Sequence, residues 1–197
     1  MRTQGTTKWT GNTRCAARAR VATAITAMVT AVGVVGCAHD KPRPPTDVPP
    51  ALQVPAGQKL TRMLHATGVQ IYQCKAGVKD PSRYSWMYQE PKADLSDRSG
   101  KDIARHYAGP TWEAEDGSKV VGVVVARVDA PGAKGIQWLL LRSKSNTGKG
   151  IFAKVQSIQR LNTIGGLAPQ DSCDAAHADQ RTRVAYSADY YFYNGRR

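Results

Sequence analysis

The stretch HYAGPTWEAEDGSKVVGVVVARV, from His106 to Val128, predicts a β-hairpin. Its turn is Glu115-Asp116-Gly117-Ser118, and Asp-Gly is a strong hairpin signal because glycine adopts a positive φ at little cost. The second arm, Val120 to Val128, carries β-branched residues on both faces, which indicates a strand that is covered on both sides. The hairpin therefore predicts a sheet at the centre of the fold.

Short strand-like stretches separated by turn residues continue on both sides of this hairpin, at intervals of roughly ten residues. Residues 58–74 predict two such strands, broken by a bulge or bend at Gly68. Residues 151–161 are compatible with a strand or a helix, and their flanking glycines favour a strand. We expect an all-β domain over residues 56–193, a single-domain antiparallel β-sandwich or barrel with long loops, followed by a tail over residues 194–197.

The N-terminal residues 1–37 predict an exported protein. Basic residues precede an apolar stretch of fifteen residues, Val21 to Val35, which is short for a membrane span and typical of a signal peptide. Val34-Val35-Gly36-Cys37 resembles a bacterial lipobox, in which diacylglycerol is attached to the Cys37 thiol. Ordinary signal cleavage after Ala38 is the alternative.

A proline-rich stretch follows at residues 38–55, where six prolines predict an extended tether. At roughly 3.1 Å per residue, such a spacer would reach about 50 Å. Lipid anchor and tether together predict a domain held in the cell envelope, at the outer membrane or its periplasmic face. Without the anchor, we expect the protein to be secreted.

The net charge of +13 is spread along the chain. Such a distribution is typical of a basic solvated surface. The chain contains no recognisable nucleic-acid-binding motif, so nucleic acid is not an expected partner. The membrane, through the anchor, and an envelope polysaccharide or protein are the expected partners.

Two of the four cysteines, Cys74 and Cys173, lie in the predicted exported domain. The other two are Cys15, in the signal peptide, and Cys37, at the lipobox. An oxidising compartment and a count of two favour a Cys74–Cys173 disulfide. Zinc is the rival interpretation, but the chain contains neither CxxC nor HxxxH, so we expect no metal and no cofactor.

The candidate catalytic residues are His106, Glu113 and Asp116, because an imidazole and a carboxylate can act as a base and its orienting partner. The alternative is a loop histidine bonded to a backbone carbonyl. Strand alternation places Glu113 opposite Trp112, so we expect Glu113 to be partly buried and paired with a basic or hydroxyl group, with His106 at a pocket rim. The candidate binding residues are Tyr107, Trp112 and Arg160.

Two functions follow from these features. The first is a cell-envelope lipoprotein with a non-catalytic binding or structural domain, which the lack of a catalytic motif favours. The alternative is an exported hydrolase or lyase that uses His106 with Glu113 or Asp116 on a polysaccharide. An enzyme requires His106 and a carboxylate to converge in a cleft, whereas a binding module does not.

Several stretches together resemble the family called domain of unknown function 3455. They include GVQIYQC (68–74), HYAGPTWEAEDGSKVVG (106–122), IQRLNTIGGLAPQDSC (158–173) and YSADYYFY (186–193). The resemblance covers nearly the whole stretch from 54 to 193 and implies a secreted or envelope β protein of the kind found in bacteria and fungi. It carries over no activity and no catalytic residue. Cys74 and Cys173 fall in its motifs, which agrees with a disulfide.

Overall fold

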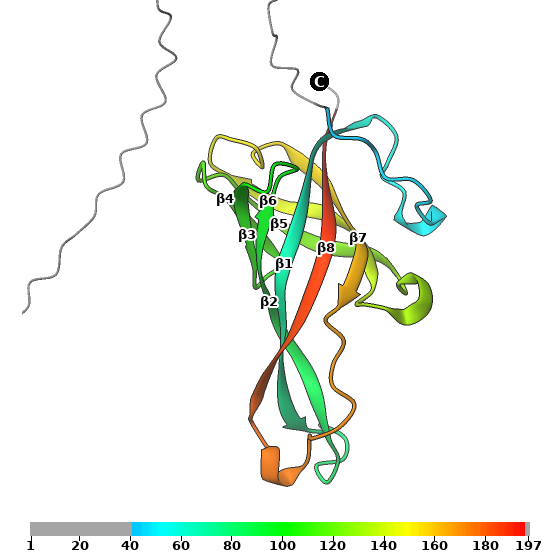
Figure 1. Ribbon diagram of the computed structural model, residues 1–197, viewed down its shortest axis with the longest axis vertical. Coiled ribbons are helices and arrows are strands. Elements are labelled where there is room, and N and C mark those ends of the chain that lie inside the picture. The colour runs from blue at the N-terminus through cyan, green and yellow to red at the C-terminus, as the bar shows by residue number, and fades with distance from the viewer. Residues whose placement is uncertain (1–40, 196–197) are drawn as a thin grey trace, which may run out of the picture. The chain divides into compact units, whose positions relative to one another are not determined.

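The computed structural model describes residues 41–195, within a compact unit that spans His39–Arg197. Eight strands form one closed antiparallel barrel in which each strand pairs with the next and the last pairs with the first (Figure 1). The all-β prediction is confirmed, with a barrel as its form. The strands are β1 (Gln58–Ala76), β2 (Tyr84–Ser96), β3 (Asp102–Tyr107), β4 (Thr111–Ala114), β5 (Lys119–Val128), β6 (Trp138–Thr147), β7 (Val155–Gly165) and β8 (Arg181–Gly195).

Helical structure within residues 41–195 is limited to three short 3₁₀ turns, none of them long enough to span a membrane. They are η1 (Pro50–Leu52), η2 (Pro131–Ala133) and η3 (Ala175–His177). The predicted signal peptide and Cys37 lie outside the described residues.

Strand β1 is the longest in the barrel, and it is continuous, so the prediction of two strands broken at Gly68 is wrong. Gly68 instead marks a close approach to β2. A Cβ at this position would lie 2.2 Å from the carbonyl oxygen of Lys92, which excludes any side chain. The bulge that the sequence suggested lies slightly later, between Ile71 and Tyr72.

The predicted central hairpin is confirmed as β4 and β5. Its turn is closed by the Ala114 amide donating to the Ser118 carbonyl at 2.9 Å and the Gly117 amide donating to the Ala114 carbonyl at 3.0 Å. The outer face of β5 is open in the middle of the strand, however, because Val123 and Val125 are 36% and 57% exposed. The expectation of cover on both faces is therefore wrong for the middle of this strand, where the outer wall of the barrel faces solvent.

The outer wall is covered elsewhere by residues that the sequence placed in the tether. Leu52 of η1 has no exposed surface and packs outside the barrel together with Val48 and Val54. The Gln159 side-chain amide donates to the Leu52 carbonyl at 2.7 Å. The folded unit therefore begins before residue 56, and the expectation of an extended tether is corrected for Val48–Val54. We call Val48–Val54 the strap.

Residues 151–161, which were compatible with a strand or a helix, belong mainly to strand β7. Val155–Gly165 pairs with both β6 and β8, and a turn over residues 151–154 precedes it. Phe152 in this turn is fully buried and packs on Phe192, with ring centroids 4.7 Å apart. Large side chains thus fill the end of the barrel interior that lies at the turn over residues 151–154.

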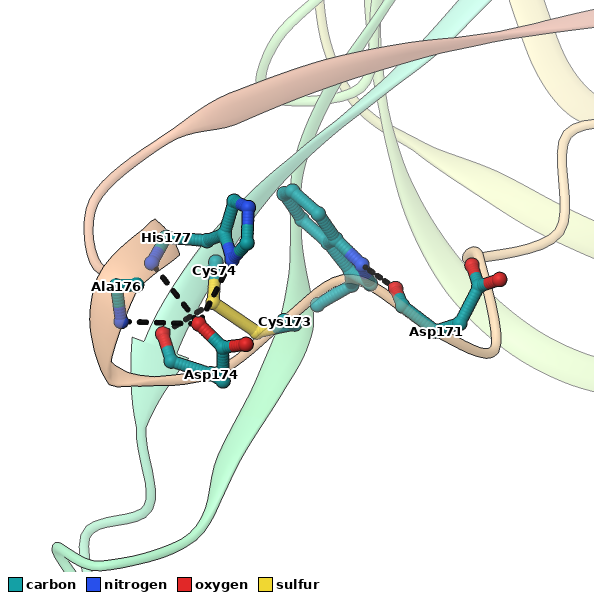
Figure 2. Close-up of polar contacts among 7 residues, drawn as sticks. Cys74, Asp171, Cys173, Asp174, Ala176 and His177 are labelled. Atoms are coloured by element: carbon teal, nitrogen blue, oxygen red, sulfur yellow. Dashed lines mark hydrogen bonds and ion pairs between the residues drawn. A yellow bond between two sulfur atoms is a disulfide. The ribbon is translucent and has the colours of Figure 1, made fainter.

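A long irregular segment joins β7 to β8, and the predicted disulfide fastens it to β1. The Cα atoms of Cys74 and Cys173 lie 5.5 Å apart, within the range for a disulfide. Figure 2 shows this bond beside Asp174, whose carboxylate accepts from the Ala176 and His177 amides at 2.9 and 3.1 Å. Asp174 thereby caps η3, as short polar side chains do at the start of a helical turn.

Candidate functional site

A cavity of ≈ 580 Å³ lies in the barrel, at the end that holds the β3–β4 turn and the β5–β6 loop. This is the opposite end from Phe152. The cavity wall combines apolar and polar side chains: Gln70, Tyr72, Tyr88, Gln89, Pro91, His106, Gly109, Pro110, Trp112, Val124, Arg127, Ile136, Gln137, Leu139, Leu141, Arg160, Leu167 and Tyr190.

Aromatic rings meet on one side of this cavity. His106 of β3 and Trp112 of β4 are Cα partners in the sheet, and both point inward. Their rings stack with centroids 4.4 Å apart, and Tyr190 of β8 meets both rings edge-on at 5.3 and 5.4 Å. The indole has room because position 122 is glycine, where a Cβ would lie 3.0 Å from the Trp112 ring.

His106 is a buried, neutral imidazole. Its Nδ1 lies 2.8 Å from the Thr111 carbonyl oxygen. A carbonyl can only accept, so Nδ1 carries the proton and donates, which leaves Nε2 as an acceptor. Burial lowers the pKa of His106 to about 3, because the charged form would lose its hydration.

Two buried polar atoms at this cavity have no hydrogen-bond partner within residues 41–195, Nε2 of Gln70 and Nε1 of Trp112. The Tyr190 hydroxyl interacts with the side chains of Tyr186 and Arg160. Burial raises the pKa of Tyr190, so this hydroxyl stays protonated. Buried polar groups without partners are rare in folded proteins. Two such groups in the wall of one cavity make this cavity the candidate binding site.

Arg160 places positive charge at the same cavity. Its Nε and Nη2 donate to the Gln137 carbonyl at 3.1 and 2.8 Å, which holds the guanidinium at the wall. Burial raises the pKa of Tyr72 and Tyr190, and the charge of Arg160 opposes this rise in both. No carboxylate among residues 41–195 forms an ion pair with Arg160.

Glu113 lies on the other face of β4, as strand alternation predicted. Its Oε2 accepts from the Tyr107 hydroxyl at 2.6 Å, and its Oε1 lies 3.5 Å from the Lys119 ammonium. The hydrogen bond from Tyr107, followed by the charge of Lys119, lowers the pKa of Glu113. The prediction that Glu113 is partly buried and paired is confirmed, but its partners lie on the outer wall. The expectation of His106 at a pocket rim is wrong, because His106 is buried and only 3% exposed.

Asp116 belongs to the β4–β5 turn. Its Oδ1 accepts from the amide and hydroxyl of Ser118, at 2.9 and 2.6 Å, and its Oδ2 accepts from the Ile151 amide at 2.9 Å. These bonds give Asp116 a structural role. The structure therefore does not bring His106, Glu113 and Asp116 together, and no base–carboxylate pair forms at His106.

Among the candidate binding residues, Trp112 and Arg160 line the cavity, whereas Tyr107 lies on the outer wall beside Lys119. Gln70 and Tyr190 also line the cavity but were not among the predicted site residues. Strand alternation places Gln70 on the same face as Cys74, and a glutamine on a buried face is an unusual feature that could have identified it. Within the described residues, no group of three or more His, Cys, Asp or Glu side chains could hold a metal ion.

The sequence model of the DUF3455 family, proteins of unknown function, matches residues 55–194. No curated protein and no solved structure matches the chain. The matched range runs from the end of the strap to the last residues of β8, and so includes every strand of the barrel almost completely. The chain belongs to the DUF3455 family.

Proposed function

We propose that this protein is a non-catalytic binding protein of the cell envelope, and that its barrel holds one small organic molecule. The observation that carries the proposal is the ≈ 580 Å³ cavity with two buried polar groups, on Gln70 and Trp112, that lack partners within residues 41–195. Folded proteins seldom leave such groups unpaired, because each unpaired group costs about 1–3 kcal/mol. A bound molecule with matching polar atoms would recover that cost.

The barrel geometry supports the same function. A closed barrel of eight strands has an interior wide enough either to be filled by side chains or to hold one small ligand. Here Phe152 and Phe192 fill one end, and the cavity occupies the other. Ligand sites are mostly apolar cavities of about 300–1,000 Å³ with a few convergent polar groups, and this cavity fits that description.

The alternative of a hydrolase or lyase receives less support from the geometry. Such an enzyme would need His106 as a base with a carboxylate within hydrogen-bond reach. The Nδ1 proton of His106 is instead donated to a backbone carbonyl, and no acidic side chain lines the cavity. A cavity of this size that opens at one end of the barrel also suits a compact molecule better than a polysaccharide chain.

We propose that a diacylglycerol on Cys37 anchors the barrel in the envelope. The disulfide between Cys74 and Cys173 supports export, because such bonds persist in oxidising compartments. Since the strap is docked, only residues 38–47 would serve as the spacer between the anchor and the barrel. The anchor would hold the barrel close to the membrane surface, with the outer membrane or the periplasmic face as its site.

Fluorescence titration with the neutral apolar probe N-phenylnaphthylamine tests the binding function, using residues 39–197 released from the anchor. Val124 lines the cavity, so Val124→Phe should fill it and weaken probe binding by at least about tenfold. Val125→Phe is the matched control, because the neighbouring Val125 is 57% exposed and does not line the cavity. Absence of probe binding, or equal loss in both variants, would contradict the proposal.

A further inference from the structure

We infer that the cavity selects an organic anion, a carboxylate on an apolar body, and that Arg160 binds the carboxylate. This inference rests on the proposed function and names its ligand class. Among residues 41–195, the cavity wall contains two cations, Arg127 and Arg160, and no acidic residue. A neutral ligand would leave this charge uncompensated, whereas an anion would neutralise it.

The bonding of Arg160 leaves a suitable set of donors. One edge of its guanidinium, formed by Nε and Nη2, is taken by the Gln137 carbonyl. The group has five N–H donors, so the end formed by the two Nη atoms still presents a fork of N–H bonds, with the Tyr190 hydroxyl interacting with the same guanidinium. Such a fork matches the two oxygens of a carboxylate. Gln137 therefore fixes the orientation in which the fork is offered.

The unpartnered buried groups have the same preference. They are Nε1 of Trp112 and Nε2 of Gln70, which can only donate. A carboxylate only accepts, so it complements donors of this kind. Nε2 of His106 differs from these donors because it is an acceptor. It would suit a hydroxyl or N–H elsewhere on the same ligand.

The remaining wall suits an apolar body. Its aliphatic and proline side chains are Pro91, Pro110, Val124, Ile136, Leu139, Leu141 and Leu167. Leu167 and Tyr88 line the cavity yet are 48% and 51% exposed, which places them at the mouth. The Tyr72 hydroxyl donates to the Gly166 carbonyl at 2.6 Å and so holds the segment before Leu167 in place.

Two probes that share an aromatic body test the inference: anilinonaphthalene sulfonate, which is anionic, and N-phenylnaphthylamine, which is neutral. In Arg160→Gln, we expect affinity for the sulfonate to fall roughly 10- to 100-fold, as for loss of a hydrogen bond to a charged group. Affinity for the neutral probe should change less than about threefold. Arg160→Lys, which keeps the charge but lacks the fork, should lie between wild type and Arg160→Gln.

Arg105→Gln is the matched control, because it removes the same charge from an exposed position that does not line the cavity. It should leave both affinities unchanged. Competition adds a test of the carboxylate itself: laurate or naphthoate should displace the sulfonate probe, and their methyl esters should not. Displacement by laurate identifies an aliphatic body, and displacement by naphthoate identifies an aromatic one.

An unchanged sulfonate affinity in Arg160→Gln, an equal loss in Arg105→Gln, or equal displacement by acids and esters would overturn the anion inference. In those cases, neutral-probe binding that still depends on Val124 would leave the proposed function standing. Loss of folding in Arg160→Gln would be recognised by its circular dichroism, and Arg160→Lys would then decide by the same readouts.

Discussion

The imidazole of His106 lies parallel to the indole of Trp112, with ring centroids 4.4 Å apart and an interplanar angle of 10°. The two residues are Cα partners across β3 and β4, so the sheet register itself creates the stack. Only 3% of His106 and 1% of Trp112 are exposed. A protonated imidazole here would lack water and any acidic neighbour in the cavity wall, so the stack is stable only with neutral His106.

The first prediction is that stability falls as the pH falls from about 6.5 towards 3. The folded state holds His106 neutral with a pKa of about 3, whereas an unfolded histidine has a pKa of 6.5. Between these values the unfolded state binds an extra proton, so stability is present above pH 6.5 and is lost in acid. The loss should approach about 1.4 kcal/mol per pH unit. Urea unfolding at pH 7, 5.5 and 4 measures it.

His106→Phe is the control for this pH effect. Phenylalanine retains a ring beside Trp112 but cannot take up a proton, so the variant should lose this part of the acid dependence. Carboxylates that titrate in the same range would contribute equally to both proteins. Parallel pH profiles for the variant and the wild type would contradict the assignment to His106.

The second prediction concerns Cys74 and Cys173. Their bond closes a large loop, with a sequence separation of 99. Cys173→Ala should lower the free energy of unfolding by roughly 2–5 kcal/mol, because the unfolded chain regains the freedom that the bond removes. Chemical denaturation measures the change. The Cys74→Ala, Cys173→Ala double variant should match the single variant, and two reactive thiols in the exported wild type would contradict the bond.

The third prediction is lipidation of Cys37, which Val34-Val35-Gly36-Cys37 suggests. Metabolic labelling with palmitate should mark the wild type and not Cys37→Ala. Labelling followed by membrane fractionation would also locate the anchored protein, and Ala38 gives no reason to expect retention at an inner membrane. Equal labelling of both proteins, or of neither, would exclude the anchor.

Local patterns predicted the parts of this fold that depend on neighbouring residues. The Asp-Gly turn predicted the β4–β5 hairpin, and the alternation of Trp112 and Glu113 predicted that they face opposite sides. Closure into a barrel depends instead on pairing of β1 with β8, where Gln58 meets Gly195. No local signal distinguishes this pairing from the two sheets of a sandwich.

The cavity could not be predicted from local patterns, because it too depends on contacts between strands that are distant in the chain. His106, Trp112, Arg160 and Tyr190 come from four strands, and only closure of the barrel brings them together. Strand alternation predicted that Glu113 faces away from Trp112, but no local pattern predicted that His106 shares the inward face with Trp112. Proximity of His106 and Glu113 in the chain suggested a catalytic pair, but across the β3–β4 turn His106 pairs with Trp112, so Glu113 points to the opposite face of the same wall.

The fourth prediction concerns the strap, in which prolines obscured an apolar contact. Leu52 is fully buried outside the barrel, and its carbonyl accepts from Gln159, which in turn accepts from the Tyr193 hydroxyl at 2.7 Å. Leu52→Ala should lower the free energy of unfolding by about 2–5 kcal/mol, the usual cost of truncating a buried leucine. Urea unfolding of residues 39–197 measures it.

Gln53→Ala is the matched control, because Gln53 is exposed, and it should change stability by less than about 0.5 kcal/mol. If Leu52→Ala were equally mild, the strap would not be docked in solution, and residues 38–55 would form the long tether that their prolines suggest.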